Sequence, residues 1–503
     1  MNNQIFNILS QTGQPHSLPL FSKVLSNTTK WLLAVVLLVF SFGVAYLTAT
    51  SEITYGAVLL ALIVGIPALL ICLFSPLFGI NVLLVVSFCV MGVKKYLPGE
   101  PPLGILLDVF TFFLFFGIFI RQSFERNISV LKHPVTVLIL IWIAYNLLEV
   151  LNPNSQSQMA WFYTVRGMAG LTLLYFVVLY AFNNLKSIGV FVHLLIFLTL
   201  LAAIYGIYQE FNGFNSIEWA WINADETRYE LIYQWGRFRK FSFLSDPTTF
   251  GILTAYIGVF CFCLSTSSQI GLLKRIYLLL SFSIMVLAMV YSGTRAAFVL
   301  IPIGLALFAF ITFKPRIIII STVLFFAGAI VVVKSPGNAT LYRVRSAFTP
   351  AKDESMQLRL QNQKNVQPFI RSNPMGGGLG STGEWGKRFS PNSELSKFPP
   401  DSGLIRIAVE QGWIGLLLFT IFTFSVLVLG IRTYIRSRDP AVKSYSLAFL
   451  MIVALLTVAN YPQEAIVLLP NSIIYYISVA ALVRLRQIDL ELVGNTELQT
   501  KSF

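Results

Sequence analysis

The sequence is poor in charged residues, histidine and cysteine. Only 12% of its 503 residues are charged, whereas about a quarter are charged in a typical soluble protein. The four cysteines, Cys72, Cys89, Cys261 and Cys263, all lie in apolar runs, where thiols pack as small apolar groups. There is no CxxC motif and no Cys/His cluster, so neither a zinc site nor a disulfide framework is predicted.

The composition indicates a membrane protein with many helical spans. Hydrophobic residues make up 56% of the chain, and the mean hydropathy is +0.74. Apolar runs near the length that crosses a bilayer occur about fourteen times. They are residues 31–50, 55–75, 79–93, 103–120, 134–152, 166–183, 188–209, 247–267, 274–292, 295–313, 316–334, 403–432, 443–461 and 467–485. This pattern predicts an all-α fold, a polytopic transmembrane helical bundle of about 12–14 spans.

The distribution of Lys and Arg predicts an orientation for the bundle. There are 36 Lys and Arg against 22 Asp and Glu, a net charge of +14, and cytoplasmic connections are enriched in Lys and Arg. With a cytoplasmic N-terminus, the short basic connections fall inside, and they contain Arg121, Arg126, Lys132, Lys186, Lys274, Arg275, Lys314, Arg316, Arg432, Arg436, Arg438, Lys443, Arg484 and Arg486. The exception is the pair Lys94-Lys95. We therefore expect both termini in the cytoplasm, and membrane anchoring rather than nucleic acid explains the positive charge.

This orientation divides the chain into five parts. They are a cytoplasmic N-terminal segment (1–30), a transmembrane bundle of about 11 spans (31–334) with an outer loop near 210–247, a large extracytoplasmic loop (335–402), C-terminal transmembrane spans (403–486) and a cytoplasmic tail (487–503). A loop as long as residues 335–402 in a compact protein is usually functional or disordered. Its aromatic, glycine-rich and basic segments favour the first, as the working loop of a membrane enzyme.

Two arginines stand at the outer edge of predicted spans. Arg239 lies among aromatic residues in GRFRKFSFLSDPTTFG, two positions after Arg237, and Arg295 lies in YSGTRAAF between two spans with a minimal connection. Asp246-Pro247 predicts a helix start, because Asp caps helices and Pro suits the first turn. Arginines at a membrane boundary are costly and tend to mark substrate sites. Anchoring of the side chain at the interface is the alternative for both arginines.

The long loop is rich in positive charge. Its basic residues are Arg343, Arg345, Lys352, Arg359, Lys364, Arg371, Lys387, Arg388 and Lys397. A basic outer funnel suits a lipid diphosphate or an acidic glycan, because Arg pairs with phosphate through two hydrogen bonds. Attraction to anionic lipid head groups is the alternative. The run from Met375 to Gly380 lacks the GxxxxGK[ST] pattern of a P-loop, so ATP chemistry is not predicted.

Asp401 lies where the long loop meets the next predicted span, in DSGLIRIAVEQGWIGLLLF. Asp or Ser is a good cap for the helix that follows. Arg406 and Glu410 are four residues apart, so they are predicted to pair on one helix face. The three histidines of the chain all fall at or near the predicted cytoplasmic side. A general base on the outer face would therefore be a carboxylate.

Four segments, in this order, resemble the O-antigen ligase and Wzy-type polymerase superfamily. RKFSFLSDPTTFG is similar to the family's arginine-led motif before a span, and SGTRAAF is close to its SGSRGA-like signature. MQLRLQNQKNVQPFIRSNPMGGGLG resembles its R…W…hPlfGvGlG segment, and DSGLIRIAVEQGWIGLLLF resembles its HNxxLxxxAExGxxGLxLF helix start. The matching positions in the last two are Arg359, Pro374, Gly378, Gly380, Glu410, Gly412 and Gly415. The resemblance covers residues 235–430 by motif and the whole chain by topology.

The resemblance implies an extracytoplasmic, inverting glycosyl transfer from an undecaprenyl-diphosphate-linked glycan, without a metal or another cofactor, in the bacterial inner membrane. Arg239 and Arg295 would hold the donor diphosphate and stabilise it as the leaving group, and Arg359 would support the same site. Further substrate contacts are expected from Arg237, Arg343, Arg345 and Glu410.

Asp401 marks a departure from the family's pattern, because the ligases carry a histidine there. Asp401 is expected to deprotonate the acceptor sugar hydroxyl instead. The expected function is therefore polymerisation of the repeat units of a surface polysaccharide, which is an O-antigen, a capsule or an exopolysaccharide. The expected partners are the lipid-linked oligosaccharide donor, a glycan or lipid A-core acceptor, the lipid bilayer and other polysaccharide assembly proteins.

Three alternatives stay open at this point. The protein could be a ligase that transfers a finished glycan to lipid A-core. A flippase for lipid-linked sugars would need broken helices or charges within the membrane, for which Asp108 and Glu149 are the candidates. A scaffold without catalytic activity would tolerate the loss of both Arg239 and Arg295.

Overall fold

A computed structural model describes residues 71–73, 75–97, 103–126, 129–234, 236–334, 354–399 and 401–500. The described residues from Cys72 onward belong to one structural unit. The predicted segment 1–30, the predicted span 31–50 and most of the predicted span 55–75 lie outside the described residues. So do Arg343 and Arg345 of the long loop.

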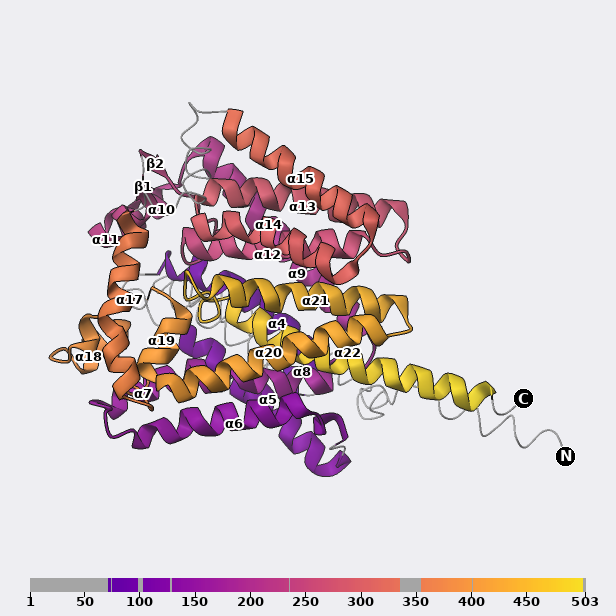
Figure 1. Ribbon diagram of the computed structural model, residues 1–503, viewed down its shortest axis with the longest axis horizontal. Coiled ribbons are helices and arrows are strands. Elements are labelled where there is room, and N and C mark those ends of the chain that lie inside the picture. The colour runs from indigo at the N-terminus through magenta and orange to yellow at the C-terminus, as the bar shows by residue number, and fades with distance from the viewer. Residues whose placement is uncertain are drawn as a thin grey trace, which may run out of the picture. The chain divides into compact units, whose positions relative to one another are not determined.

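The described part of the chain is almost entirely helical (Figure 1). Its α-helices are α4 (Pro76–Lys94), α5 (Gly104–Glu125), α6 (Pro134–Leu148), α7 (Gln158–Val165), α8 (Leu174–Ala181), α9 (Leu185–Asn212), α10 (Ser216–Asn223), α11 (Glu226–Ile232), α12 (Pro247–Ser265), α13 (Leu272–Ser292), α14 (Arg295–Thr312), α15 (Pro315–Lys334), α17 (Glu354–Ser372), α18 (Gly383–Phe389), α19 (Gly403–Glu410), α20 (Gly412–Arg436), α21 (Pro440–Ala459) and α22 (Asn471–Thr500). Short 3-10 or π turns are η1 (Ser129–Leu131), η2 (Glu149–Leu151), η3 (Arg166–Gly170), η4 (Leu171–Leu173) and η6 (Leu395–Lys397). Strands β1 (Tyr233–Gln234) and β2 (Arg237–Phe238) form a small antiparallel hairpin.

The helices confirm a polytopic bundle. Among the described residues, 10 helices are long and apolar enough to cross a membrane. They are Pro76–Lys94, Gly104–Glu125, Pro134–Leu151, Gln158–Ala181, Leu185–Asn212, Pro247–Ser265, Leu272–Ser292, Arg295–Thr312, Gly412–Arg436 and Pro440–Ala459. Each overlaps a span predicted from the apolar runs. The predicted spans at 316–334 and 467–485 also fall on helices, namely α15 and α22.

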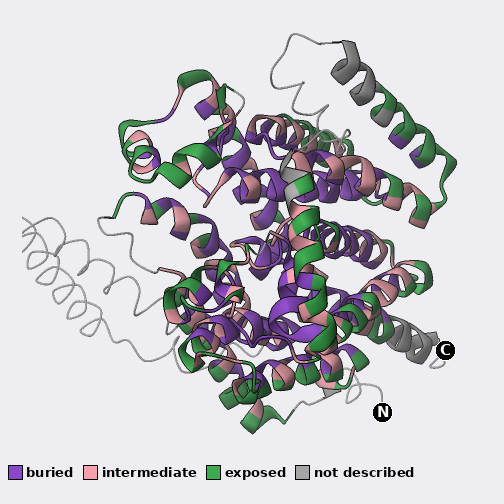
Figure 2. Ribbon diagram, turned by 60° about the vertical axis from the view of Figure 1, so that its left-hand side comes forward, coloured by how far each residue is buried: buried purple, intermediate pink, exposed green. Residues whose placement is uncertain are grey.

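The centre of the bundle is α12. Its apolar window is 94% buried within the protein, against 28% for α5 and α13, and it packs against α13, α14 and α21. The peripheral helices show exposed residues on their outward surfaces, whereas the interior of the bundle is buried (Figure 2). Large apolar side chains such as Val109, Phe116 and Phe119 are each 60% exposed. Outward apolar faces of this kind suit contact with lipid.

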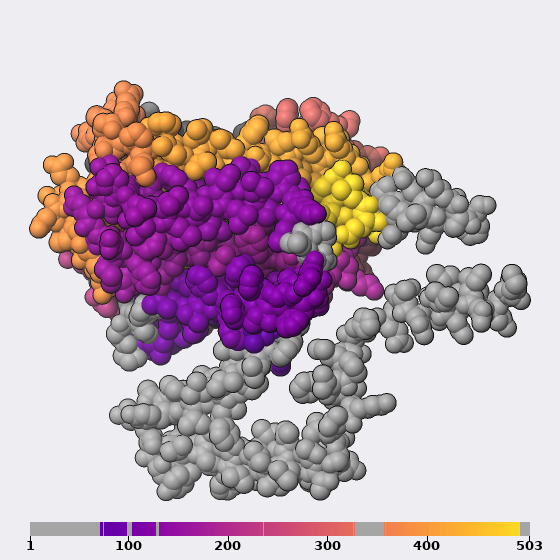
Figure 3. All heavy atoms as spheres, turned by 90° about the horizontal axis from the view of Figure 1, so that it is seen from below, coloured from indigo at the N-terminus to yellow at the C-terminus, as the bar shows by residue number. Residues whose placement is uncertain are grey.

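The connections predicted to be extracytoplasmic gather at one end of the bundle (Figure 1). Helices α10, α11, α17, α18 and α19 and the β-hairpin all lie at this end, which we call the loop end. The turn between α20 and α21 and the last part of α22 lie toward the opposite end. In the space-filling view, residues coloured indigo to magenta, from the earlier part of the described chain, cover most of the face shown. Residues coloured orange collect at the loop end (Figure 3).

The predicted single span 403–432 is wrong in one respect, because the chain breaks between α19 and α20. Gly412 has a φ of 68°, a left-handed conformation that favours glycine, and an added Cβ would collide with the Pro374 carbonyl. The amides of Gly377 and Gly378 donate to the carbonyls of Val409 and Glu410, each at 2.9 Å. This backbone pairing anchors the end of the long loop to the break.

Candidate functional site

Arg239 is buried and braces the turn between α13 and α14. Its side chain is among the few buried charged groups, with 7% of the residue exposed. Nε donates to the Ser292 carbonyl at 3.1 Å, and Nη2 donates to the Thr294 hydroxyl at 2.9 Å. Nη1 donates to the Leu231 carbonyl at 3.1 Å. The guanidinium therefore ties α11 to the turn that precedes Arg295.

Local sequence explains why the turn stands so close to the start of α12. Asp246 caps α12 by accepting from the amides of Thr248 and Thr249, as the Asp246-Pro247 pair predicted. Gly251 allows the close approach, because a Cβ there would collide with the Ser292 hydroxyl. The Thr294 hydroxyl in turn donates to the Pro247 carbonyl at 2.8 Å. These contacts fix the first residue of α14, which is Arg295.

Arg239 meets the turn that carries Arg295, because its Nη2 donates to Thr294, the residue directly before Arg295. The pKa of Arg239 is lowered to about 10, mainly by burial; the Asp246 carboxylate raises this pKa and the Arg295 charge lowers it. The two positive charges therefore repel each other across this turn. A bound anion would relieve the repulsion. We call Arg239 and Arg295 the arginine pair.

Arg237 lies outside this pair, on the rim of the loop end. Its side chain is 52% exposed, and Nη2 lies 3.7 Å from the Glu210 carboxylate. Lys240 lies 3.5 Å from the same carboxylate. The predicted substrate contact of Arg237 stays a prediction, and the geometry gives this arginine a partner on α9.

A second set of site residues surrounds α19. The Nε of Arg406 lies 3.1 Å from Glu410, and its Nη1 lies 3.1 Å from Glu464, which confirms the predicted pairing of Arg406 with Glu410. The Thr382 hydroxyl also donates to Glu410. Glu410 is only 1% exposed. We call these four residues the Arg406 network, and it joins α18, α19 and the connection between α21 and α22.

Asp401 and Arg359 lie beside the Arg406 network. Arg359 Nε is 4.0 Å from the Asp401 carboxylate, whose side chain is 42% exposed. Arg359 Nη1 donates to the Pro462 carbonyl at 3.1 Å. The Asp401 charge contributes to raising the pKa of Glu464, although burial is the larger cause and Arg406 opposes it. The Asp401 side chain is 42% exposed and that of Glu464 is 19% exposed, so Asp401 is the more accessible carboxylate.

Glu464 and Thr382 are the residues that the sequence analysis missed. Glu464 sits in NYPQEA, a polar break between two apolar runs, and that break was the available signal. Thr382 carried no signal, because its partner Glu410 is distant in sequence. Within the described part of the chain, no three His, Cys, Asp or Glu side chains come together as metal ligands would.

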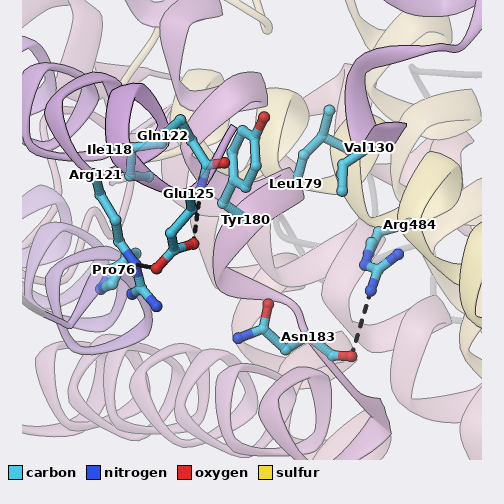
Figure 4. A pocket seen from close by; sticks show the side chains of 10 residues that line it. All are labelled: Pro76, Ile118, Arg121, Gln122, Glu125, Val130, Leu179, Tyr180, Asn183 and Arg484. Carbon is cyan, nitrogen blue, oxygen red and sulfur yellow. Dashed lines mark hydrogen bonds and ion pairs between the residues drawn. The ribbon is translucent and has the colours of Figure 1, made fainter. Parts of the chain in front are cut away.

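Two cavities differ in their relation to these residues. A cleft of about 610 Å³ opens at the loop end, beside the arginine pair, and Leu231 and Asp246 are part of its wall. A pocket of about 110 Å³ is lined by α5, α8 and α22 (Figure 4). There Arg121 pairs with Glu125, and Arg484 donates to the Asn183 carbonyl. The cleft at the loop end is the better candidate for a substrate, because it is larger and one of its wall residues, Leu231, accepts a hydrogen bond from Arg239.

The comparisons with known proteins concern the same part of the chain. No curated protein matches the sequence at a significant level. Residues 280–420 match the family model described as O-antigen ligase. The matched segment contains Arg295, Arg359, Asp401, Arg406 and Glu410, whereas Arg239 precedes it. The match of this segment supports a place for the chain in the O-antigen ligase and Wzy-type polymerase superfamily and glycan transfer as its general activity, and the 10 long apolar helices among the described residues indicate a multi-pass membrane protein.

Proposed function

We propose that the protein polymerises repeat units of a surface polysaccharide by inverting glycosyl transfer from an undecaprenyl-diphosphate-linked glycan. The reaction would take place on the extracytoplasmic face of the bacterial inner membrane, where the predicted orientation puts the loop end. The observation that supports this proposal is the 2.9 Å hydrogen bond from the buried Arg239 to Thr294, the residue directly before Arg295, which brings the two arginines to one turn. An arginine guanidinium forms strong, charge-assisted hydrogen bonds with phosphate oxygens, and a second positive charge nearby strengthens the attraction.

The two arginines have different roles in this proposal. Arg295 is partly exposed at the start of α14 and contacts the diphosphate. Arg239 is buried and bound to three backbone or hydroxyl oxygens, so it adds positive charge and holds the turn in place. Preorganised charge stabilises the negative charge that develops on a leaving group. Both arginines therefore favour departure of the polyprenyl diphosphate.

Asp401 is the proposed general base. The acceptor hydroxyl oxygen forms a bond with the anomeric carbon, the bond from that carbon to the diphosphate oxygen breaks, and the hydroxyl proton passes to the Asp401 carboxylate. The exposure of Asp401 supports this role, because a base must reach the acceptor hydroxyl. Arg359 holds the carboxylate and is a positioning residue.

The main alternative is ligation of a finished glycan to lipid A-core, because the matched family model is described as O-antigen ligase. We favour the polymerase because Asp401 stands where the ligases carry a histidine. A flippase is less well supported. Its candidate charge Asp108 pairs with Arg166 of a neighbouring span at 3.1 Å, and its candidate Glu149 accepts from Asn152 at 2.8 Å.

The test is glycan length on gels from a deletion strain that expresses the wild type, Arg295→Ala or Asp401→Ala. Single-repeat products in the deletion strain and in both variants would agree with a polymerase. The exposed Arg371 of α17 provides the control, and Arg371→Ala should restore full-length glycan. Full-length glycan that stays on the polyprenyl carrier would identify a ligase. Normal glycan with stably expressed Arg295→Ala would contradict the proposed site.

A further inference from the structure

The cleft at the loop end is built from the connection of α10 to α12. Its volume of about 610 Å³ lies within the usual range for small-molecule sites, about 300–1,000 Å³. Seven of its ten wall residues are polar or charged, and the wall comes from α10, α11, β1 and the residues directly before α11 and α12. The ten residues are Trp221, Asp225, Thr227, Arg228, Glu230, Leu231, Ile232, Gln234, Ser245 and Asp246. The sequence analysis assigned no role to any residue of α11.

The cleft borders Arg239, one member of the arginine pair. The Leu231 carbonyl that accepts from Arg239 belongs to a lining residue. Asp246 also lines the cleft, and its carboxylate raises the pKa of Arg239. A group attached directly to a diphosphate at Arg239 and Arg295 would therefore reach this cleft. The donor's first sugar is the group with that attachment.

The charges in the cleft favour an uncharged ligand over a second phosphate. Three carboxylates, of Asp225, Glu230 and Asp246, stand against the single guanidinium of Arg228. Like charges repel at short range, so an anion would be disfavoured beside these residues. Sugar hydroxyls instead donate to carboxylates and accept from hydroxyl and amide groups. The exposed residues Thr227 and Glu230 provide such groups on α11.

The cleft is held in shape by contacts on its far side. The Arg228 guanidinium lies 4.2 Å from the ring centroid of Trp221, and Nη1 donates to the Trp221 carbonyl at 2.6 Å. The ammonium of Lys95 lies 4.6 Å from the same ring. Two cation–π contacts on one indole fix α10 relative to α11 and α4. A preformed site loses less entropy when a ligand binds.

We infer that this cleft is the subsite for the first sugar of the lipid-linked donor, the residue joined to the diphosphate. The inference rests on the proposed function, because it requires the diphosphate to lie at the arginine pair. The subsite selects an uncharged or amino sugar and rejects one that carries a carboxylate or phosphate. It therefore makes residues of α11 determinants of donor specificity.

The test measures binding of two probes to the full-length protein in nanodiscs. One probe is undecaprenyl diphosphate without sugar, and the other is the lipid-linked glycan that accumulates in the deletion strain. Thr227→Trp fills the cleft, and Glu230→Ala removes a carboxylate from its wall. Both should weaken binding of the glycan-bearing probe by about tenfold and leave binding of the bare diphosphate unchanged. The exposed residue Glu226 precedes Thr227 and is not part of the cleft wall, so Glu226→Ala is the matched control.

Arg295→Ala separates this inference from the proposed function. If the proposed function holds, Arg295→Ala weakens binding of both probes, whereas unchanged binding of both would overturn the proposed diphosphate site and, with it, the premise of this inference. Unchanged binding of the glycan-bearing probe to Thr227→Trp would overturn the subsite. So would an equal loss for the two probes. A raised KM for the acceptor glycan, with donor binding unchanged, would also overturn it and reassign the cleft to the acceptor.

Discussion

The guanidinium of Arg239 donates a 2.9 Å hydrogen bond to the hydroxyl of Thr294, the residue directly before Arg295. The same hydroxyl donates to the Pro247 carbonyl at the start of α12. Thr294 is 3% exposed, so water cannot replace either bond. One buried hydroxyl thus connects the two helices that begin at this place.

Replacing Thr294 with Val should lower activity while the protein still folds. The change keeps the shape of the side chain and removes the hydroxyl, so it leaves a buried donor of Arg239 and the Pro247 carbonyl without this partner. Leaving these buried groups unpaired costs about 1–3 kcal/mol of the free energy of folding. Because the turn that carries Arg295 is then held less firmly, we expect kcat/KM to fall about tenfold or more. Thr294→Ser restores the hydroxyl and should recover most of the activity. An active Thr294→Val variant would show that the brace does not position Arg295.

In the Arg406 network, Arg406→Met should lower stability more than Glu410→Gln does. Arg406→Met leaves the buried Glu410 and the part-buried Glu464 without their shared cation, and breaking a buried ion pair costs about 3–5 kcal/mol. Glu410→Gln keeps the pair between Arg406 and Glu464 and should cost less. The melting temperatures of the two purified variants in detergent show which change destabilises the protein more. A Glu410→Gln protein that melts below Arg406→Met would contradict this account.

Lys95 should make stability depend on pH near neutrality. Burial lowers the pKa of Lys95 to about 7, although Glu218 and Asp246 raise it and Arg228 lowers it. Between about pH 7 and pH 10 the unfolded chain holds a proton that the folded protein has released. The free energy of unfolding therefore rises with pH in this window, by at most about 1.4 kcal/mol per pH unit.

The measurement is the melting temperature of the wild type and of Lys95→Met at pH 6 and pH 8.5. The wild type should be more stable at the higher pH, and the difference should shrink in Lys95→Met. The same difference in both proteins would assign the pH dependence to other groups.

Asp401→Asn should remove activity without changing stability. The ion pair between Asp401 and Arg359 is 4.0 Å long and partly exposed, and such pairs contribute about 0–1 kcal/mol. Loss of a general base lowers the rate by about 10²–10⁴-fold. Glu394 is exposed in the same loop, and Glu394→Gln serves as the control. If Asp401→Asn lowers the melting temperature together with the activity, the residue has a structural role and is not the general base.

Local patterns in the sequence predicted the parts of the fold that depend on neighbouring residues. The helix start at Asp246-Pro247 and the pairing of Arg406 with Glu410 are confirmed, because each involves residues within one helical turn. The predicted continuous span 403–432 is wrong, because Gly412 turns to let the chain pair with Gly377 and Gly378.

Contacts between distant segments lay beyond these patterns. Glu464 completes the network around Arg406 from another connection, and apolar periodicity says nothing about which polar breaks meet in space. The convergence of Arg239 on the turn before Arg295 was expected from the family resemblance. The hydrogen bonds that produce it depend on the packing of α11, α12 and α13.

The backbone hydrogen bonds of Gly377 and Gly378 with Val409 and Glu410 close the intervening chain, residues 379–408, into a loop. The contact that closes this loop is noncovalent. Exported proteins often close such loops with a disulfide, which acts largely by restricting the unfolded chain. This closure consists of backbone hydrogen bonds, so it exists only in the folded protein. Because it contains no disulfide, thiol reductants leave it intact. A protease that cuts at the exposed Lys397 would produce two fragments that stay together until denaturant separates them.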